Sequence, residues 1–568
     1  MSLFSSIQMA SGALQASQVG LQVVGQNISN ANTPGYIRES VNYTAGPTVQ
    51  QGSVLEGTGV QVQSITQNID QFLEQRLRSA GSDKTGADTV KQTYSQLESV
   101  VGALDNTNSL STSLNSFFSS IANISSQPQS TSVRNLAALQ GQSLTKSINQ
   151  LYGDVGQLRS DTNAQIDSMA TNINNLVTQI GKLNTQILGL GANSSSGSDA
   201  VGLTDQRDQA LTSLSQLISI RTSVQPDGSV SVYSGNEYLV AEGNTQSVET
   251  VHSSNRGTTV SNLEIAGINV PLDTSSGQLG GLVQSRDTVL GGFQDQLDTV
   301  AGTLLNDFNQ IYSSGQGLDG YTQITSQNAV TSASQQLDRA GLQTAPTTGS
   351  FQIVVTDTQA NTSTTTNVPI TISSSGKGTT LTSLAAQINA VSGLSATVKN
   401  GQLTIATTGA NTQFSFANDT SGTLTALGLN TFFTGTGAAD IAVNSDVLND
   451  PSKFAASTSG IGADATNATA LSNFRNTALS SQNGSTLDSV YSNVMDGLSS
   501  ASATATSTAS AADTFQSTLS NQELSVSGVS IDDEAVQLMQ YQQSYEAAAK
   551  YITTLNNLFT ILDQMVIT

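Results

Sequence analysis

Both ends of the chain carry apolar or small residues at alternating spacings of four and three, and this constrains the fold more than any other feature. In the first 30 residues the series is Leu3, Ile7, Ala10, Leu14, Ser17, Leu21, Val24 and Ile28. Such spacing is typical of a heptad seam on an amphipathic helix. Residues 1–37 contain no charged side chain. A lone helix of this kind is marginal in water, because helices in proteins are stabilised mainly by burying their apolar face.

The C-terminal end repeats the pattern. After Ile531 the seam runs through Leu538, Tyr541, Tyr545, Ala548, Ile552, Leu555, Phe559, Leu562 and Val566. A second register widens the apolar face, through Ala547, Tyr551, Leu558, Ile561 and Met565. Ser530 and the acids at 532–534 supply an N-cap and a negative first turn. We predict that the two ends pair in one domain and also pack against neighbouring copies, since head-to-tail contacts build rings or open helices.

The middle of the chain alternates in character. Helical periodicity covers about 85–190, 203–220 and 281–313, and the Ser/Ala/Thr-rich tract 498–513 is predicted to be a long helix of small residues. The Gly- and Ser-rich stretch 191–198 is predicted to be a flexible break. Pro226-Asp-Gly228 is predicted to turn a hairpin between 220–224 and 229–233. Thr- and Gly-rich strand-like runs fill 350–435 around one short helix.

These patterns predict an α+β multidomain fold with long helical terminal and rod domains and inserted β-rich parts. A chain of 568 residues is too long for one core. The expected divisions are paired terminal helices (1–36 with 530–568), a mainly helical rod domain (37–220 with 280–340 and 460–529), a small β subdomain (221–275) and an inserted β-rich outer domain (345–440).

Composition excludes several kinds of chemistry. The chain has no cysteine, which rules out disulfides, thiolate nucleophiles and Cys-ligated metals. A single histidine, His252, forbids any site with two His ligands and is predicted to lie in a polar surface loop. The net charge of −22 disfavours binding to nucleic acid. No apolar run approaches the length of a membrane span, and the start lacks the basic segment of a cleaved secretory signal.

The remaining motifs are better explained by structure than by chemistry. Gly315–Gly320 matches G-x-G-x-x-G but follows a predicted helix, so we predict a glycine turn there, and another turn at Ser375–Gly378. Asp205-Gln-Arg207-Asp208 and Arg286-Asp287 are interpreted as surface ion pairs on helices. Three consecutive acids at 532–534 point in different directions on a helix, which favours a cap over a cation site. No catalytic, cofactor-binding or metal-ligating residue is predicted.

One segment carries a distinctive sequence motif. From Ser11 to Arg38 the helix runs into Asn27-Ile-Ser-Asn30-Ala-Asn32-Thr-Pro34-Gly35-Tyr36. Asparagines bond nearby backbone, and Pro-Gly favours a tight turn, so this is physically a helix stop. The segment resembles the N-terminal motif of bacterial flagellar axial proteins (rod, hook and hook-associated subunits), although Ser29 stands where that family more often has Ala.

Other blocks resemble the hook-associated members of that family. They are 527–535, 541–545, 547–550, Leu555–Leu562, Leu203–Asp208, Gly280–Asp287 and Gly317–Gly320. The resemblance implies a structural subunit that joins hook to filament, with paired terminal helices on an inner tube wall. It implies self-assembly, contacts with the hook protein and a second junction protein, and export through the flagellar type III apparatus without a cleaved signal. It also implies an extracellular location and a cytoplasmic chaperone at the C-terminal helix, with no membrane insertion.

Three alternatives stay open: another axial subunit (hook or filament cap), a secreted adhesin, and a secreted hydrolase using carboxylates, of which the enzyme is disfavoured because no carboxylate pair stands out. The predicted assembly interface consists of Leu3, Ile7, Leu14, Leu21, Val24, Ile28, Asn30, Asn32, Pro34, Gly35, Tyr36, Leu538, Tyr541, Tyr545, Ile552, Leu555, Phe559, Leu562 and Val566.

Overall fold

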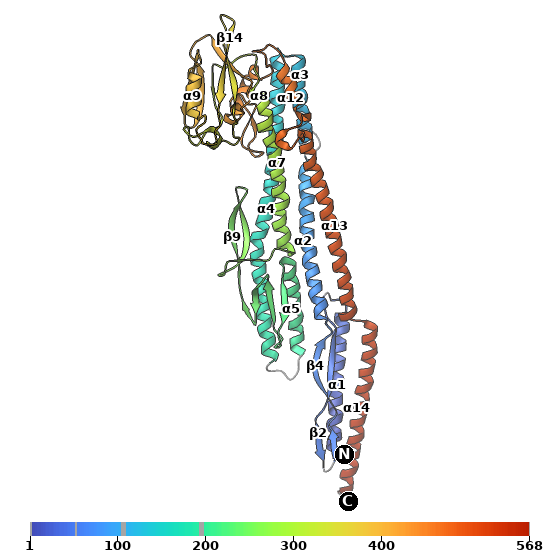
Figure 1. Ribbon diagram of the computed structural model, residues 1–568. Helices are drawn as coiled ribbons and strands as arrows, with labels where there is room; N and C mark the ends of the chain where they lie inside the picture. Colours follow the sequence, from blue (N-terminus) through green and yellow to red (C-terminus); the bar gives the residue numbers. More distant parts are fainter. Residues whose placement is uncertain (1–2, 34, 52–53, 104–108, 192–197, 567–568) are drawn as a thin grey trace. The chain divides into compact units, whose positions relative to one another are not determined.

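The computed structural model describes residues 3–33, 35–51, 54–103, 109–191 and 198–566 (Figure 1). The chain divides into two compact units. Unit 1 holds residues 1–92, 161–286 and 504–568, and unit 2 holds residues 93–160 and 287–503. Both chain termini therefore belong to unit 1.

Unit 1 begins and ends with long helices, α1 (Leu3–Asn30) and α14 (Ile531–Val566). After α1 comes a β ribbon, which we define as β1 (Glu39–Ala45), β2 (Thr48–Gln51), β3 (Val54–Gly57) and β4 (Val60–Gln67). In it β1 pairs with β4 and β2 with β3, both antiparallel. The helices α2 (Gln71–Ala103), α4 (Thr131–Gly191) and α13 (Leu487–Ser527) each contribute residues to both units.

A second part of unit 1 packs a small β region on helices. It contains α5 (Ser198–Leu217), α6 (Gly277–Gln284) and seven strands. The strands are β5 (Arg221–Val224), β6 (Val230–Ser234), β7 (Glu237–Ala241), β8 (Asn244–Thr245), β9 (Val248–Asn255), β10 (Thr258–Ile265) and β11 (Val270–Pro271). Ile173 of α4, Leu214 of α5, Val232 of β6 and Leu279 of α6 share one buried core. The predicted hairpin is confirmed as β5–β6, and Gly228 at its turn has a φ of 86°.

Unit 2 has a helical part with an aromatic core. Its helices include α3 (Leu110–Ser126), α7 (Gly291–Thr303), α8 (Asn309–Ser313), α11 (Ser445–Asn449) and α12 (Thr466–Asn473). The rings of Phe117 and Phe308 lie 5.6 Å apart, and both contact Phe432 and Phe433. Buried aromatic pairs of this kind add stabilisation beyond their area.

The predicted β-rich segment at 350–435 is confirmed, but it contains two short helices, α9 (Leu381–Asn389) and α10 (Thr423–Leu427), where one was predicted. Its main strands are β12 (Gln323–Thr325), β13 (Gly349–Asp357), β14 (Thr362–Ile370), β15 (Leu394–Lys399), β16 (Gln402–Thr407) and β17 (Thr412–Ala417). One sheet has the order β14-β13-β17 and another the order β12-β16-β15. Smaller elements close the segment: α10 (Thr423–Leu427), β18 (Phe433–Thr434) and β19 (Ala442–Val443).

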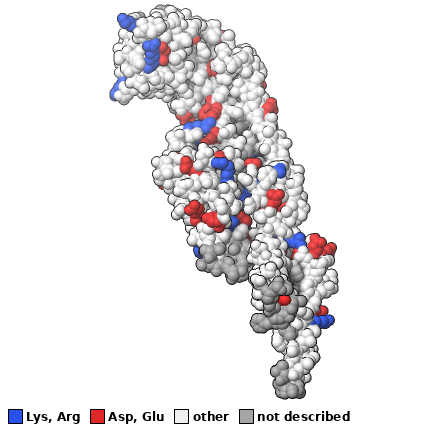
Figure 2. Space-filling view, turned by 60° about the horizontal axis from the view of Figure 1, so that its bottom comes forward, with Lys and Arg blue, Asp and Glu red and all other residues white. Residues whose placement is uncertain are grey.

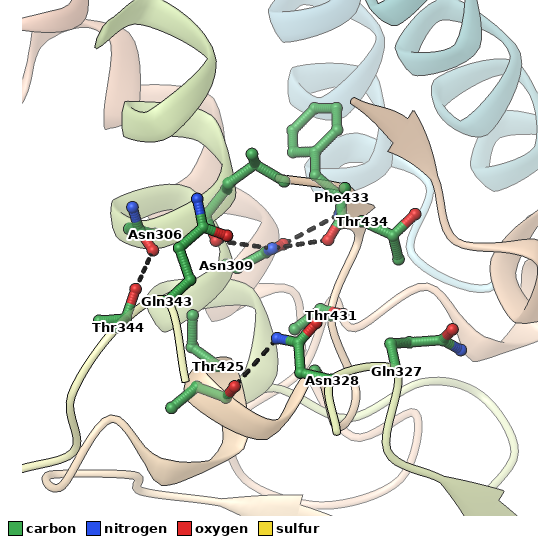
Figure 3. A pocket seen from close by; sticks show the side chains of 14 residues that line it. Asn306, Asn309, Gln327, Asn328, Gln343, Thr344, Thr425, Thr431, Phe433 and Thr434 are labelled. Atoms are coloured by element: carbon green, nitrogen blue, oxygen red, sulfur yellow. Dashed lines mark hydrogen bonds between the residues drawn. The ribbon is translucent and has the colours of Figure 1, made fainter. Parts of the chain in front are cut away.

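Asn309 ties this β-rich segment to the helix that precedes it (Figure 3). Its Nδ2 donates to the carbonyl of Phe433 at 2.7 Å, and its Oδ1 accepts from the amides of Phe432 and Phe433 at 3.0 Å. The adjacent cavity, about 20 Å³, is lined by amide, hydroxyl and apolar side chains without a charged group. That volume suits a water molecule rather than a substrate.

Most other helix predictions are confirmed, with one difference in kind. The predicted helix at 281–313 is continuous from 277, but two π-helical segments interrupt it, at Ser285–Leu290 and Leu304–Phe308. The small-residue tract is helical within α13. Ser375–Gly378 forms a turn as predicted, whereas Gly315–Gly320 is an irregular segment in which Gln316 pairs with Ser457 as an isolated β-bridge. Most of the predicted flexible break, 192–197, lies outside the described residues. The β ribbon at 39–67 was not predicted.

The predicted environment of His252 is wrong. It lies in strand β9, opposite Ser261 of β10, rather than in a loop. The Nδ1 atom of His252 is 3.2 Å from the Ser261 hydroxyl. Residues 251–254 are all exposed on this edge strand, so the sequence lacks the alternation that would have indicated a strand.

Candidate functional site

The terminal helices α1 and α14 pack side by side and antiparallel within unit 1 (Figure 1). Gly20 of α1 faces Tyr541 of α14, and seven residues further along α1, Asn27 faces Glu534 at the start of α14. A Cβ atom at Gly20 would lie 2.7 Å from the Tyr541 ring, so the close approach of the helices requires glycine there. The ring of Tyr43, from the β ribbon, lies 6.4 Å from that of Tyr541.

Asn27 is the centre of a polar group that we call the terminal polar cluster. It consists of Asn27 and Glu534, which are buried, and Tyr36, Arg38 and Glu39, which are half-buried. The Nδ2 atom of Asn27 donates to the Glu39 carbonyl at 2.9 Å and to Glu534 Oε2 at 3.1 Å. Its Oδ1 accepts from the Tyr36 hydroxyl at 2.9 Å and the Glu39 amide at 3.0 Å. The side chain thereby uses both its donors and both lone pairs, which is full satisfaction for an asparagine.

Arg38 completes the cluster from the other side. Its Nε lies 2.7 Å from Glu534 Oε1, and the Glu534 side chain is fully buried. Its amide donates to the Ser527 carbonyl, at the end of α13. Burial raises the pKa of Tyr36, and the nearby charges of Glu39, Asp205 and Glu534 raise it further. The end of the N-terminal motif is therefore fixed against the junction between α13 and α14.

Sequence reasoning identified Tyr36 as a site residue and included Asn27 and Arg38 in the motif, but it missed Glu534. We interpreted that residue only as one of three capping acids, whereas its neighbours Asp532 and Asp533 are exposed. The missed signal was register: Glu534 stands seven residues before Tyr541 on the C-terminal seam. An acid on an apolar seam is a candidate for a buried partner.

The structure gives the predicted interface residues several different environments. Val24 and Leu555 are buried. Half-buried positions are Ile7, Leu14, Leu21, Ile28, Asn30, Tyr36, Leu538, Tyr541 and Ile552, and exposed ones are Asn32, Gly35, Tyr545, Phe559 and Leu562. Pro34 lies outside the described residues, as do the side chains of Leu3 and Val566.

The second apolar register of α14 is turned away from α1. We call it the outer face of α14. Ala547 is exposed, and the exposed fractions of the larger side chains are 43% for Tyr551, 46% for Leu558, 53% for Ile561 and 72% for Met565. Large apolar side chains in one exposed stripe are typical of an interaction surface.

Two interpretations of charged pairs are wrong. Arg207 is only 5% exposed and donates to the Gly228 carbonyl at 2.7 Å and to Asn184 Oδ1. Arg286 is 1% exposed and donates to Ser261, Asn163 and Asn262. Both guanidinium groups tie helices to neighbouring strands instead of forming surface pairs, because a planar fork of five donors can satisfy several carbonyl oxygens at once.

Asp205, beside Arg207, is also partly buried and receives a short hydrogen bond from Gln67 of β4. Burial raises the pKa of Asp205 to about 6. The pKa of the neighbouring Asp208 is raised by burial as well, against the effect of Arg78 and Arg207. This cluster joins α5 to the β ribbon and to α2.

Charge is sparse over the molecule. On the face in Figure 2, red and blue side chains stand in scattered groups, several of them mixed, and most of the surface is white. Among the described residues, no group of three or more His, Asp or Glu is arranged to hold a metal ion. Within the described part of the chain, the search for a helix with the length and hydropathy of a membrane span finds none.

Comparisons with known proteins agree with this geometry. Residues 7–36 match the family model "Flagella basal body rod protein", and residues 520–565 match "Flagellar basal body rod FlgEFG protein C-terminal". Both paired helices thus carry flagellar rod-type segments, which defines the class of the molecule as a flagellar axial protein. Residues 94–326 match "Flagellar hook-associated protein FlgK helical domain".

The similarity to other proteins extends over nearly the whole chain. Flagellar hook-associated protein 1 of Escherichia coli (strain K12) is 26% identical over 98% of this chain and 99% of its own length. That of Salmonella typhimurium is 28% identical over the same shares. The solved structure of the flagellar hook junction protein FlgK from Burkholderia pseudomallei has a similar fold, with a TM-score of 0.50, 17% identity and coverage of 80% of this chain and all of that one. The chain is thus similar along nearly its whole length to flagellar hook-associated protein 1, and the family models that it matches all describe proteins of the flagellum.

Proposed function

We propose that this chain is the structural subunit that joins the hook to the filament of a bacterial flagellum, and that it polymerises through its terminal helices. The observation that carries the proposal is the outer face of α14: an apolar stripe left uncovered on a helix whose other face already packs on α1. Burying each large apolar side chain contributes roughly 1.5–3 kcal/mol, so such a face favours association.

The proposal includes the arrangement of the parts. The paired helices, 1–36 with 530–568, line the inner wall of a tube, the helical segments form the rod domain, 221–275 forms a small β subdomain, and 345–440 is an outer domain. The predicted interface residues on α1 and α14 then contact neighbouring copies. No catalysis is part of this role.

The partners follow from the same role. They are other copies of this chain, the hook protein on one side and a second junction protein on the other. The chain reaches an extracellular position through the flagellar export apparatus without a cleaved signal, and a cytoplasmic chaperone covers the C-terminal helix before export. The exposed apolar residues of α14 support the need for such a cover.

The test is to delete the gene in a motile bacterium that carries it and to image the flagella by electron microscopy. Hooks that bear no filaments are expected. Cells without hooks would point to a hook subunit instead, and normal filaments would contradict the proposal.

A further inference from the structure

A groove runs between α1 and the β ribbon in unit 1. Its volume is about 920 Å³. Ile7, Ser11, Gln15 and Val19 line it from α1, and Val49 and Val60 line it from the ribbon. None of the residues lining the groove is charged.

The outer face of α14 is left uncovered in its own chain. Its large side chains are exposed there, from 43% at Tyr551 to 72% at Met565, whereas the groove is lined by residues of α1 between Ile7 and Val19 and by the ribbon. The outer face of α14 is therefore not accommodated by the groove of the same molecule.

We propose that the groove of one copy binds the outer face of α14 from a second copy. This inference rests on the proposed function and names the contact through which copies polymerise. Groove and face differ, so the contact is heterologous and continues from copy to copy into a ring or an open helix.

The dimensions of the two surfaces agree. At about 1.5 Å per residue, the α1 side of the groove from Ile7 to Val19 is roughly 18 Å long. The outer face from Tyr551 to Met565 is roughly 21 Å long by the same rise. Four large exposed side chains of α14 can thus lie along the groove at spacings of three, four and seven residues.

Charge supports the same pairing. In a chain of net charge −22, two carboxylate-rich surfaces would repel each other. The groove has no charged residue, and after Lys550 the only charged side chain of α14 is Asp563. These two surfaces are therefore able to meet without burying an unpaired charge.

The test is disulfide mapping in the full-length chain, which has no cysteine of its own. Gln15→Cys is placed in the groove and Leu558→Cys on the outer face. Within one molecule the two positions cannot react: Gln15 lies level with about residue 546 of the antiparallel α14, roughly 18 Å along the axis from Leu558. A disulfide needs Cα atoms about 4.4–6.8 Å apart.

The two single variants are mixed, polymerised and oxidised. The expected product is a mixed dimer with a 15–558 disulfide identified by mass spectrometry, and the double variant should give a ladder of multimers. The matched control, Gln15→Cys with Asn556→Cys, should give at least tenfold less product because residue 556 is turned about 160° from Leu558 around the helix.

The other outcomes of this experiment separate a failure of the groove assignment from a failure of the proposed function. Polymers that form without the 15–558 disulfide, or that form the 15–556 disulfide equally well, would overturn the groove assignment and leave the proposed function standing. Failure of the full-length chain to polymerise under any condition that supports assembly of flagellar subunits would overturn both.

Discussion

Arg38 and Glu534 lie 2.7 Å apart, so the end of the N-terminal motif and the first turn of the C-terminal helix form one ion pair across 496 positions of sequence. Glu534 is fully buried, and Asn27 donates to its second oxygen. A buried carboxylate needs such partners, because leaving it unpaired costs several kcal/mol. The pair therefore fixes where α14 begins relative to α1.

Replacing Arg38 should reveal the cost of leaving the Glu534 carboxylate buried without its ion-pair partner. Among the described residues, Arg38→Ala leaves the buried Glu534 carboxylate with Asn27 as its remaining side-chain partner, and should destabilise the packing of α14 on α1 by about 3 kcal/mol. Hydrogen exchange of the amides in the first turns of α14 measures this. Asp532→Ala, at an exposed acid of the same turn, serves as the control and should change exchange little. Equal protection in Arg38→Ala and the unchanged chain would contradict the role given to the pair.

Asn27→Asp should have a different, pH-dependent effect. It places a second carboxylate about 3 Å from Glu534, and two carboxylates so close cannot both ionise without a large cost. The cluster should open at pH 7, and Arg38 should become accessible to trypsin. The packing should recover as pH falls and one carboxyl binds a proton. Cleavage after Arg38 that is equally slow at pH 7 and in the unchanged chain would count against the cluster.

Asp205 should make the stability of unit 1 depend on pH in the direction opposite to that expected for a salt-bridged acid. Its pKa in the folded chain, about 6, is above its ordinary value of 3.8, so the folded state binds the proton more tightly. The ionised carboxyl therefore costs stability above pH 6, and that cost disappears as pH falls towards 3.8. Asp205→Asn should stabilise unit 1 by about 1–2 kcal/mol at pH 7, a value reduced for partial exposure, and have little effect at pH 4.

The matched control is Asp227, also in unit 1, where hydrogen bonds from Ser229 lower the pKa. The ionised Asp227 stabilises the folded chain at pH values above its ordinary pKa. This stabilisation is lost as pH falls through the lowered pKa of the folded state. Asp227→Asn should therefore destabilise slightly at pH 7. The check is thermal unfolding at both pH values, and a stabilisation by Asp205→Asn that persists at pH 4 would refute the assignment.

Two leucines three positions apart on α14 should separate folding from assembly. Leu555 is 5% exposed and Leu558 is 46% exposed. Leu555→Asp buries a charge against α1 and should loosen α14 in the monomer. Leu558→Asp should leave the circular dichroism of the monomer unchanged but reduce polymerisation, measured by sedimentation, at least tenfold. Asn556→Asp controls for the added charge, and normal polymers of Leu558→Asp would contradict the role of the outer face.

Periodicity in the sequence was enough to predict α1, α14, the hairpin at Gly228 and the β-rich segment with α9, the first of its two short helices. These elements are set by local patterns. Apolar residues spaced by three and four indicate a helix, alternating residues indicate a strand, and both patterns can be recognised within a short stretch of sequence. The pairing of the two ends was also predictable, since two apolar seams in one chain can bury their surfaces against each other.

The polar parts of the site could not be predicted in the same way. Arg207 and Arg286 looked like members of surface pairs, because helical spacing to an acid is visible in sequence while burial by a distant strand is not. Glu534 looked like a cap for the same reason: its partners, Asn27 and Arg38, are about 500 residues away. In the β ribbon, β2 and β3 have only four residues each and the second half of β1 is exposed, so these strands show little alternation. The alternation of Val60 and Val62 with glutamines in β4 was the signal that sequence reasoning missed.

The most direct test of the central claim is complementation of the deletion strain with the full chain and with a chain lacking residues 538–568. The full chain should restore filaments on hooks. The shortened chain should leave hooks without filaments, because it lacks both the seam that packs on α1 and the outer face of α14. Filaments of normal number and length on cells that carry only the shortened chain would contradict the account.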